Sequence, residues 1–450
     1  MATSVSELVR MDLDHLIHPM HHSSDLQDAQ IFTKGRGAML TDARGREVID
    51  GLAGLWNVTL GHGQTELVQA AAEQMSTLAY SSTYVGYSNE PAIRLAAKII
   101  EKTYPNMESV YFTTAGAESN ESAFKTARFY WKTMGKPDKV KVISRRFGYH
   151  GVTMATMSAT GMPAFHENFG PLMPNFLQID PPYRFQSQYG DLPEDEFGIK
   201  TANLLEEAIL REGAETVAAF IAEPVMGAAG VIVPPATYFP RIREICDQYR
   251  VLFIADEIIT GFGRTGKWFA LEHWGVQPDI VAFAKAITSG YLPLGGIILS
   301  KEITRAIHEL PPAKRYMHGA TYSGHPVCCA VGLKTLEIVE REGLVERSAV
   351  LGKRLLDGMQ RLYELPAVGE VRGLGLAVAV ELAQDRDSRR LFAPERETAH
   401  KVLNLAREYG LHTLGMGDRI SLAPPFITPE ETIDRIPEIL YDAIAELTGR

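Results

Sequence analysis

Two charged residues, Asp256 and Lys285, each follow a short apolar run, and their types suit covalent chemistry on an amine. Asp256 ends the run VLFIAD, and Lys285 follows the run IVAFA. Both runs are typical of buried parallel strands, whose carboxyl ends form the sheet edge where open α/β sheets bind ligands. Desolvation at that edge lowers the pKa of a lysine, so that a neutral, nucleophilic amine becomes accessible at about pH 7.

A carboxylate beside such a lysine could hold a proton on a heteroaromatic nitrogen. Together, a Schiff-base lysine and this acid are what pyridoxal phosphate requires, because the protonated ring then acts as an electron sink. An ordinary ion pair, or a lysine that extends its ammonium from a strand end to solvent, explains the same two residues. Taken alone, the pair favours this structural interpretation over the catalytic one.

A possible phosphate site lies in the run TTAGAESNES, residues 113–122, where a strand passes through small residues into a helix. The N–H groups of Gly116 and Ala117, with the positive end of the helix dipole, suit an anion. An ordinary capped helix start is the alternative. In the run GYHG, residues 148–151, Tyr149 could stack on a planar ring or pack in the core.

Other polar runs carry weaker signals. The run HGATYSGHP, residues 318–326, is too polar for a buried strand and is either a loop that reaches a phosphate or a solvated turn. Four histidines near the N-terminus resemble a metal cluster, but they have no cysteine or acidic partner at a zinc-like spacing. We therefore predict no metal site at His15, His18, His21 and His22.

Composition restricts the class of protein. The 450 residues include 45 Lys+Arg and 55 Asp+Glu, a net charge of −10, with 45% apolar residues, as in a globular protein. No basic run indicates nucleic acid or an anionic membrane as a partner. Three cysteines cannot cross-link a chain of this length, which favours a reducing compartment. No apolar run is long enough for a membrane span, and the N-terminal residues MATSVSELVRMDLDHL do not resemble a signal peptide. We expect a soluble, cytoplasmic enzyme.

The elements that must position these residues are predicted to be strands and helices that alternate along the chain. Short apolar runs alternate with amphipathic segments, which predicts a mostly parallel sheet covered on both faces. The predicted strands are Ser109–Thr113, Val140–Ser144, Val217–Ala222, Val251–Ala255, Ile280–Ala284 and Gly296–Leu299. Longer helices mixed with short strands follow after Leu333. We therefore predict three parts: an N-terminal arm with part of a small domain (1–60), a large domain (61–325), and a C-terminal small α+β domain (326–450).

The motifs together resemble one family. The runs DGLAGLWN, FGYHGVT, AEPVMGAAGVIVPP, ADEIITGFGRTG, AFAKAITSGYLPLGG, TYSGHPVCCA and ISLAPPFIT occur in the order and spacing of class III, pyridoxal-phosphate-dependent aminotransferases of fold type I. The resemblance is strongest to the amine:pyruvate, or omega, branch. It implies an α/β fold with a large domain around a mostly parallel central sheet and a smaller α+β domain. It also implies a homodimer at minimum, with active sites at the subunit interface.

The same resemblance assigns roles to single residues. Lys285 occupies the position of the family's Schiff-base lysine, which also moves the substrate proton. Asp256 occupies the position of the acid that pairs with the pyridine nitrogen. Ile258 and Tyr149 stand on the two faces of the ring, and Thr321 matches the threonine that reaches the phosphate from the partner subunit. The remaining implied cofactor contacts are Gly116 and Ala117 in the phosphate cup, His150, and the acid Glu223 beside the ring.

Two departures from the family pattern stand out. The cup, usually Gly-Ser-Glu-Ala-Asn-Asp, is GAESNE here, so Ala117 lacks a hydroxyl and one charge-assisted hydrogen bond of about 1.5–3 kcal/mol. Positions where relatives place an arginine for a substrate carboxylate hold Ser421 and Leu414. Arg419 is the nearby arginine, and because residues 419 and 421 share one face of a strand, it is a candidate carboxylate binder.

The implied substrate pocket is apolar and aromatic apart from Arg419, which suits an uncharged amine side chain. Its members are Met20, Leu55, Trp56, Tyr84, Tyr149, Val152, Ala228, Ile259 and Arg419, although each taken singly could equally be a core residue. The expected reaction moves an amino group from a primary amine to pyruvate and gives alanine and a ketone or aldehyde. The alternatives are a β-alanine- or taurine-type aminotransferase, a class III decarboxylase or aminomutase, and a non-catalytic protein that kept the fold.

Overall fold

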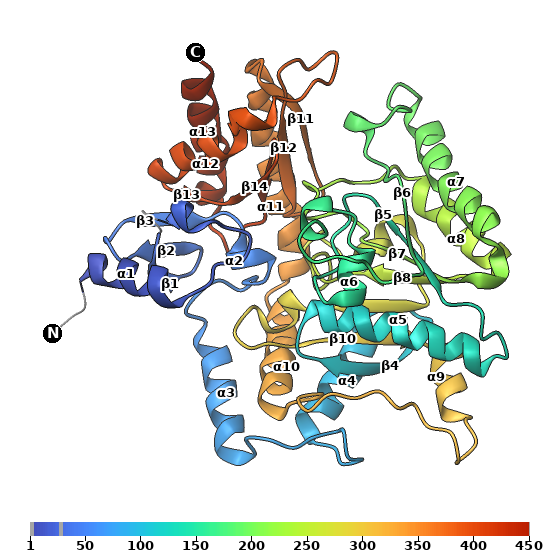
Figure 1. The fold of residues 1–450 in the computed structure, drawn as a ribbon. Helices are drawn as coiled ribbons and strands as arrows, with labels where there is room; N and C mark the ends of the chain where they lie inside the picture. The colour runs from blue at the N-terminus through green and yellow to red at the C-terminus, as the bar shows by residue number, and fades with distance from the viewer. Residues whose placement is uncertain (1–3, 27–29, 450) are drawn as a thin grey trace.

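A seven-stranded sheet forms the centre of the molecule in a computed structural model that describes residues 4–26 and 30–449 (Figure 1). Its strand order is β4–β10–β9–β8–β7–β5–β6, with the last five strands parallel and β10 antiparallel to both of its neighbours. The strands are β4 (Met107–Thr113), β5 (Lys141–Arg145), β6 (Phe176–Ile179), β7 (Val217–Ala222), β8 (Leu252–Asp256), β9 (Ile280–Phe283) and β10 (Gly295–Ser300).

The sheet is covered on both faces, as its apolar strands predict. Every residue of β7 is buried, and the neighbouring side chains of Phe220 and Ile221 pack in different clusters, one on each face of the sheet. The Ile221 face is covered by α5 (Gly116–Thr133). The Phe220 face is covered by α4 (Glu90–Lys102), α7 (Glu194–Glu212), α8 (Tyr238–Tyr249) and α10 (Pro326–Arg341). The predicted mostly parallel α/β sheet is confirmed.

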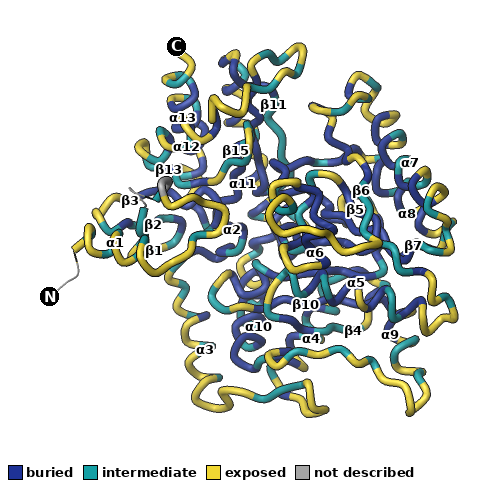
Figure 2. Tube along the Cα trace, in the orientation of Figure 1, coloured by how far each residue is buried: buried dark blue, intermediate teal, exposed yellow. Residues whose placement is uncertain are grey.

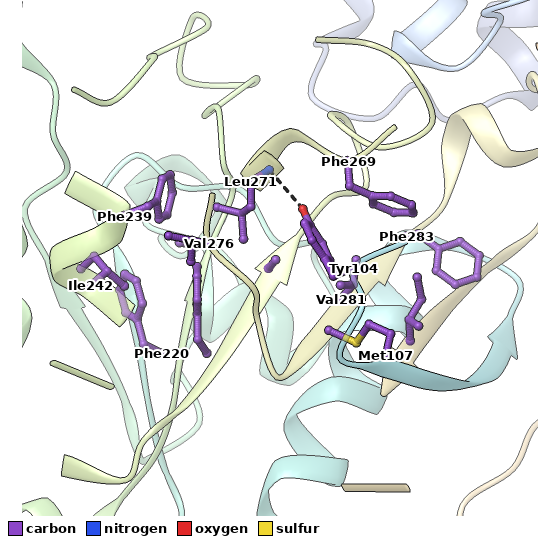
Figure 3. Packing of buried hydrophobic residues seen from close by; sticks show 14 of the residues in the cluster. Tyr104, Met107, Phe220, Phe239, Ile242, Phe269, Leu271, Val276, Val281 and Phe283 are labelled. Atoms are coloured by element: carbon purple, nitrogen blue, oxygen red, sulfur yellow. Dashed lines mark hydrogen bonds between the residues drawn. The ribbon is translucent and has the colours of Figure 1, made fainter. Parts of the chain in front are cut away.

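The Phe220 face holds the largest aromatic cluster (Figure 3). Phe239 and Phe253 stack with ring centroids 5.9 Å apart, and the buried Tyr104 accepts the Leu271 N–H at 3.1 Å. Such close packing keeps the strand ends, and the side chains they carry, at fixed positions.

Two smaller four-stranded sheets complete the fold. The first, β1–β2–β3–β13, joins N-terminal strands to a C-terminal one, because β3 pairs in parallel with β13. Figure 1 accordingly shows the blue N-terminal sheet beside the red C-terminal helices. The second sheet has the order β11–β12–β15–β14. Their strands are β1 (Phe32–Arg36), β2 (Met39–Asp42), β3 (Glu47–Asp50), β11 (Val368–Gly373), β12 (Val378–Leu382), β13 (Leu411–His412), β14 (Leu414–Met416) and β15 (Arg419–Leu422).

The remaining helices lie around these sheets. A buried cluster of their apolar faces includes Leu355, Val402 and Leu440. Figure 2 shows the central strands buried, whereas much of α3 and the chain that follows it is exposed. Within the described ranges, no helix is both long enough and apolar enough to cross a membrane. These helices are α1 (Val5–His15), α2 (Ala53–Trp56), α3 (Thr65–Thr77), α6 (Met154–Ala159), α9 (Lys301–His308), α11 (Leu344–Met359), α12 (Thr398–Glu408) and α13 (Glu430–Thr448).

Candidate active site

Asp256 and Lys285 lie at the same edge of the central sheet. Asp256 is the last residue of β8, and Lys285 follows β9 after a single intervening residue. The two strands are parallel neighbours, with Asp256 opposite Ala282. Their carboxyl ends therefore bring a carboxylate and an amine to the position where open α/β sheets bind ligands.

The buried Asp256 carboxylate is oriented by three neighbours. Its Oδ2 accepts from Asn120 Nδ2 at 2.8 Å and lies 2.7 Å from His150 Nδ1. Its Oδ1 accepts the Ile258 N–H at 3.2 Å. A carboxylate offers about four acceptor sites, so Oδ1 keeps capacity for one more donor, such as the protonated nitrogen of a pyridine ring.

Lys285 combines an unusual backbone with a lowered pKa. Its φ of 49° lies in the left-handed region, which is uncommon for a residue with a side chain and recurs at functional sites. Burial lowers the pKa of Lys285 to about 8, with Asp256 and Glu223 opposing the shift and the Arg264 cation acting with it. A useful fraction of neutral amine is thus present at about neutral pH.

Ile258 and Tyr149 come from two different turns at this edge. A Cβ on Gly116 would come within 2.9 Å of Ile258 Cδ1, so the absence of a side chain at position 116 leaves room for Ile258. Tyr149 is partly buried, and its ring centroid lies 5.5 Å from that of Phe165. Burial raises the pKa of the Tyr149 hydroxyl, so it stays protonated and can donate a hydrogen bond.

The start of α5 supplies backbone donors. Ala115 is its N-cap and no side chain caps it, so the first N–H groups of the helix, including those of Gly116 and Ala117, have no intrahelical acceptor. The Ala117 methyl faces Gly151, where a Cβ would come within 2.7 Å of it. These residues fit an anionic group at the positive end of a helix.

Glu223 connects two walls of the site. Its Oε1 accepts the Tyr149 N–H at 3.1 Å, and its Oε2 accepts the Gly227 N–H at 3.0 Å. The buried guanidinium of Arg145 donates to the Glu223 carbonyl oxygen. Burial raises the pKa of Glu223, while His150 and Arg145 oppose that shift. The carboxylate therefore fixes the turn that carries Tyr149 against the loop that carries Gly227.

A cavity of about 120 Å³ ends at Lys285. Seven residues named from the sequence line it: Met20, Leu55, Trp56, Tyr149, Ala228, Ile259 and Lys285. Six others were missed as lining residues: Phe165, Gly227, Leu414, Gly415, Met416 and Ser421. Relatives place an arginine at positions 414 and 421, as the resemblance indicated. Those two positions were the signal that could have predicted that the hairpin β14–β15 lines the cavity.

Three residues of the predicted substrate pocket, Arg419, Val152 and Tyr84, do not line this cavity. Arg419 donates to the carbonyl oxygens of Met416 at 3.2 Å and Ala229 at 3.0 Å, and it lines a different hollow. Val152 is largely exposed. Tyr84 is also exposed and packs against Gly319.

Thr321, which the resemblance assigns to the phosphate of the partner subunit, is exposed, and its carbonyl oxygen accepts from Tyr80 Oη at 2.8 Å and from Ser82. The chain thus holds Thr321 on a surface unit with Tyr84, and neither residue lines the cavity to which Lys285 belongs. At the N-terminus, His18 Nε2 lies 2.9 Å from Asp12 Oδ2. The structure holds no cluster of three potential metal ligands in its described residues.

Comparison with known proteins gives consistent matches over nearly the whole chain. The family model described as Aminotransferase class-III matches residues 22–444. The putrescine–pyruvate aminotransferase of Pseudomonas aeruginosa is 41% identical, covering 94% of this chain and 92% of its own. The diaminobutyrate–2-oxoglutarate transaminase of Halomonas elongata is 39% identical, covering 99% and 97%. The structure of an (S)-enantioselective omega-transaminase from Thermomicrobium roseum superposes with a TM-score of 0.96 at 44% identity, covering 99% and 100%.

Proposed function

The chain belongs to the class III aminotransferases, and from that premise we propose that it transfers an amino group from a primary amine to pyruvate, with pyridoxal phosphate as its cofactor. The observation that carries this proposal is the apolar cavity that Lys285 lines. Trp56, Phe165 and Ile259 contribute apolar walls, and no carboxylate or guanidinium lies among the described residues that line it. Such a cavity favours an uncharged substituent on the amine.

The residues present fit the cofactor. The spare acceptor capacity of Asp256 suits a protonated ring nitrogen, and the uncapped N–H groups of α5 suit a phosphate. When bound, pyridoxal phosphate supplies the electron sink that makes the hydrogen on the substrate carbon acidic. Lys285 would take up and return that proton, and Tyr149 and Ile258 would pack against the two faces of the ring.

The acceptor needs a place for its carboxylate. Besides Lys285, the described lining residues that carry a side-chain hydrogen-bond donor are Tyr149, Ser421 and Trp56. They suit a small keto acid such as pyruvate better than 2-oxoglutarate, whose second carboxylate would need a cation of its own. The name of the Pseudomonas relative, putrescine–pyruvate aminotransferase, supports the same acceptor and makes a diamine the second donor to test.

We propose a homodimer in which each chain completes the other's site. Thr321 and Tyr84, both assigned to the site by resemblance, lie on one exposed unit, and exposed apolar side chains surround them. They include Val85, Tyr87, Met317 and Tyr322. Contact with a second copy would bury them. The three free, buried cysteines Cys246, Cys328 and Cys329 support a cytoplasmic location.

The test is an absorbance spectrum of the purified protein with pyridoxal phosphate, recorded before and after 1-phenylethylamine and then pyruvate. We expect the cofactor band to disappear with the amine and to return with pyruvate. Return with 2-oxoglutarate but not with pyruvate would refute the proposed acceptor. Release of CO2 from an α-amino acid would indicate a decarboxylase, and product formation without any keto acid would indicate an aminomutase.

A further inference from the structure

The loop that follows β7 has its tip at residues 227–230. Side chains that do not line the cavity hold this tip in place. Gly227 and Ala228 line the cavity, and the next two carbonyl groups point to arginines of the second small sheet. Arg419 Nη1 donates to Ala229 O at 3.0 Å, and Arg372 Nε donates to Gly230 O at 2.8 Å.

The position of this tip also depends on glycine. Gly230 has a φ of 92°, and a Cβ there would come within 2.7 Å of Arg419 Cδ. The aliphatic part of the arginine thus packs directly on the loop backbone. The tip and the arginine form one close contact that a side chain at position 230 would break.

The two arginines are held differently. Arg372 Nη2 lies 2.8 Å from the buried Glu381 Oε2, and its guanidinium lies 5.2 Å from the Tyr183 ring centroid. It is therefore fixed by a carboxylate of its own sheet and by the Tyr183 ring. Arg419 instead bonds two backbone carbonyls, Ala229 O and Met416 O. Because Met416 lines the cavity and Ala229 directly follows the lining residue Ala228, Arg419 joins two walls.

There is space behind one of these walls. A second hollow of about 340 Å³ lies beside the hairpin β14–β15, and Arg419 lines it. Gly415 lines both hollows, so the hairpin is the partition between them. The pairing of β15 with β12 holds the hairpin in its own sheet, and Arg419 joins it to the loop tip at Ala229 O.

We propose that Arg419 is a specificity-determining positioning residue: by joining Met416 O to Ala229 O it fixes the separation of two cavity walls and so limits the bulk of the amine that enters. This inference rests on the proposed amine donor. Arg419 touches neither substrate nor cofactor in this role. It acts through the loop tip and the hairpin.

The experiment compares the holoenzyme with Arg419→Met, which keeps the side-chain volume but removes every donor. Arg419→Lys keeps the positive charge but lacks the planar guanidinium. We therefore expect it to reach only one of the two carbonyl oxygens, Met416 O or Ala229 O. Arg211→Met, on the exposed surface of α7, is the matched control. Loss of the cofactor band is followed with 2-aminobutane and with 1-(1-naphthyl)ethylamine, without keto acid. The KM for pyruvate is measured separately.

We expect Arg419→Met to raise the ratio of the second-order rate constants for loss of the cofactor band, bulky amine over small amine, by about tenfold, chiefly through a lower apparent Kd for the bulky amine. Arg419→Lys should lie between wild type and Arg419→Met, and the control should match wild type. Hydrogen–deuterium exchange should become faster in residues 226–232 and 414–419. Gly230 N donates to Gly227 O at 3.0 Å there, and this bond depends on the fastened tip.

An unchanged amine ratio in a folded Arg419→Met enzyme that retains its cofactor band overturns the inference. A tenfold rise in the KM for pyruvate with an unchanged amine ratio also overturns it, and would make Arg419 a carboxylate-binding residue. A wild-type enzyme that reacts with neither amine refutes the proposed function itself, and the inference with it. The wild-type reaction therefore distinguishes the two failures.

Discussion

His150 Nδ1 lies 2.7 Å from Oδ2 of Asp256, and both side chains are buried. Asn120 donates to the same oxygen and also to the His150 carbonyl oxygen at 2.9 Å. The three residues come from α5, from the turn after β5 and from β8. Asp256 is thus oriented by two other segments at the sheet edge, and its Oδ1 is directed by the Ile258 N–H. A carboxylate fixed in this way can meet a cofactor ring without rearrangement.

Replacement of Lys285 by alanine should abolish turnover and leave the fold intact. The side chain ends in the cavity and is the amine we assign to proton transfer, so no neighbouring group can substitute for it. Activity with 1-phenylethylamine and pyruvate, together with a circular dichroism melting curve, measures both effects. Lys200→Ala on α7 is the control. Wild-type activity in Lys285→Ala would refute the mechanism.

The apoprotein should capture pyridoxal phosphate with a pH dependence set by Lys285. Since burial lowers the pKa of this amine to about 8, the neutral form predominates above that pH and falls about tenfold per pH unit below it. The capture rate should therefore rise with pH and level off just above 8. Stopped-flow absorbance between about pH 6 and pH 10 measures this. A rate still rising at the upper limit would indicate an ordinary lysine.

The same lowered pKa predicts a change in the free energy of unfolding of the apoprotein. Between about pH 8 and 10.5 the unfolded chain binds a proton on Lys285 that the folded chain has released. The contribution of Lys285 to stability therefore increases with pH across this window. Urea denaturation of wild type and Lys285→Met at both ends of the window measures it. An equal pH dependence in the two proteins would contradict the shift.

Ala117→Ser should strengthen cofactor binding. It adds a hydroxyl beside the uncapped N–H groups of α5, and a charge-assisted hydrogen bond contributes about 1.5–3 kcal/mol, or roughly tenfold or more in Kd. Titration of the apoprotein with pyridoxal phosphate gives the Kd, with Ala72→Ser on exposed α3 as the control. An unchanged Kd would mean that the phosphate does not lie at this helix start.

Glu223→Gln should destabilise the protein by about 1–3 kcal/mol. The two carboxylate oxygens accept the N–H groups of Tyr149 and Gly227, whereas glutamine places an amide donor against one of them. One buried N–H is then left without an acceptor. The free energy of unfolding is compared with that of Glu207→Gln, an exposed change on α7. Equal stability of the two variants would show that the carboxylate is dispensable.

Local patterning predicted the elements well. The strand Val217–Ala222 was predicted with the bounds observed, because its wholly apolar run is bounded by polar residues on both sides. The edge strand β6 was missed. It is only four residues long and partly buried, so its apolar signal is weak.

The sequence by itself determined the family, through the order and spacing of motifs along the chain. It also determined the α/β sheet and the strand-end positions of Asp256 and Lys285, because these follow from residue types over a few adjacent positions. Only the tertiary structure decided which way Arg419 points. Residues 419 and 421 do lie two apart on one strand, as predicted. The Arg419 guanidinium nevertheless donates to the carbonyl oxygens of Ala229 and Met416 and does not line the cavity. The same holds for Thr321 and Tyr84, whose exposed positions are set by contacts with Tyr80 and Gly319. Long side chains follow hydrogen-bond partners that are distant in sequence, and no local pattern encodes where those partners lie.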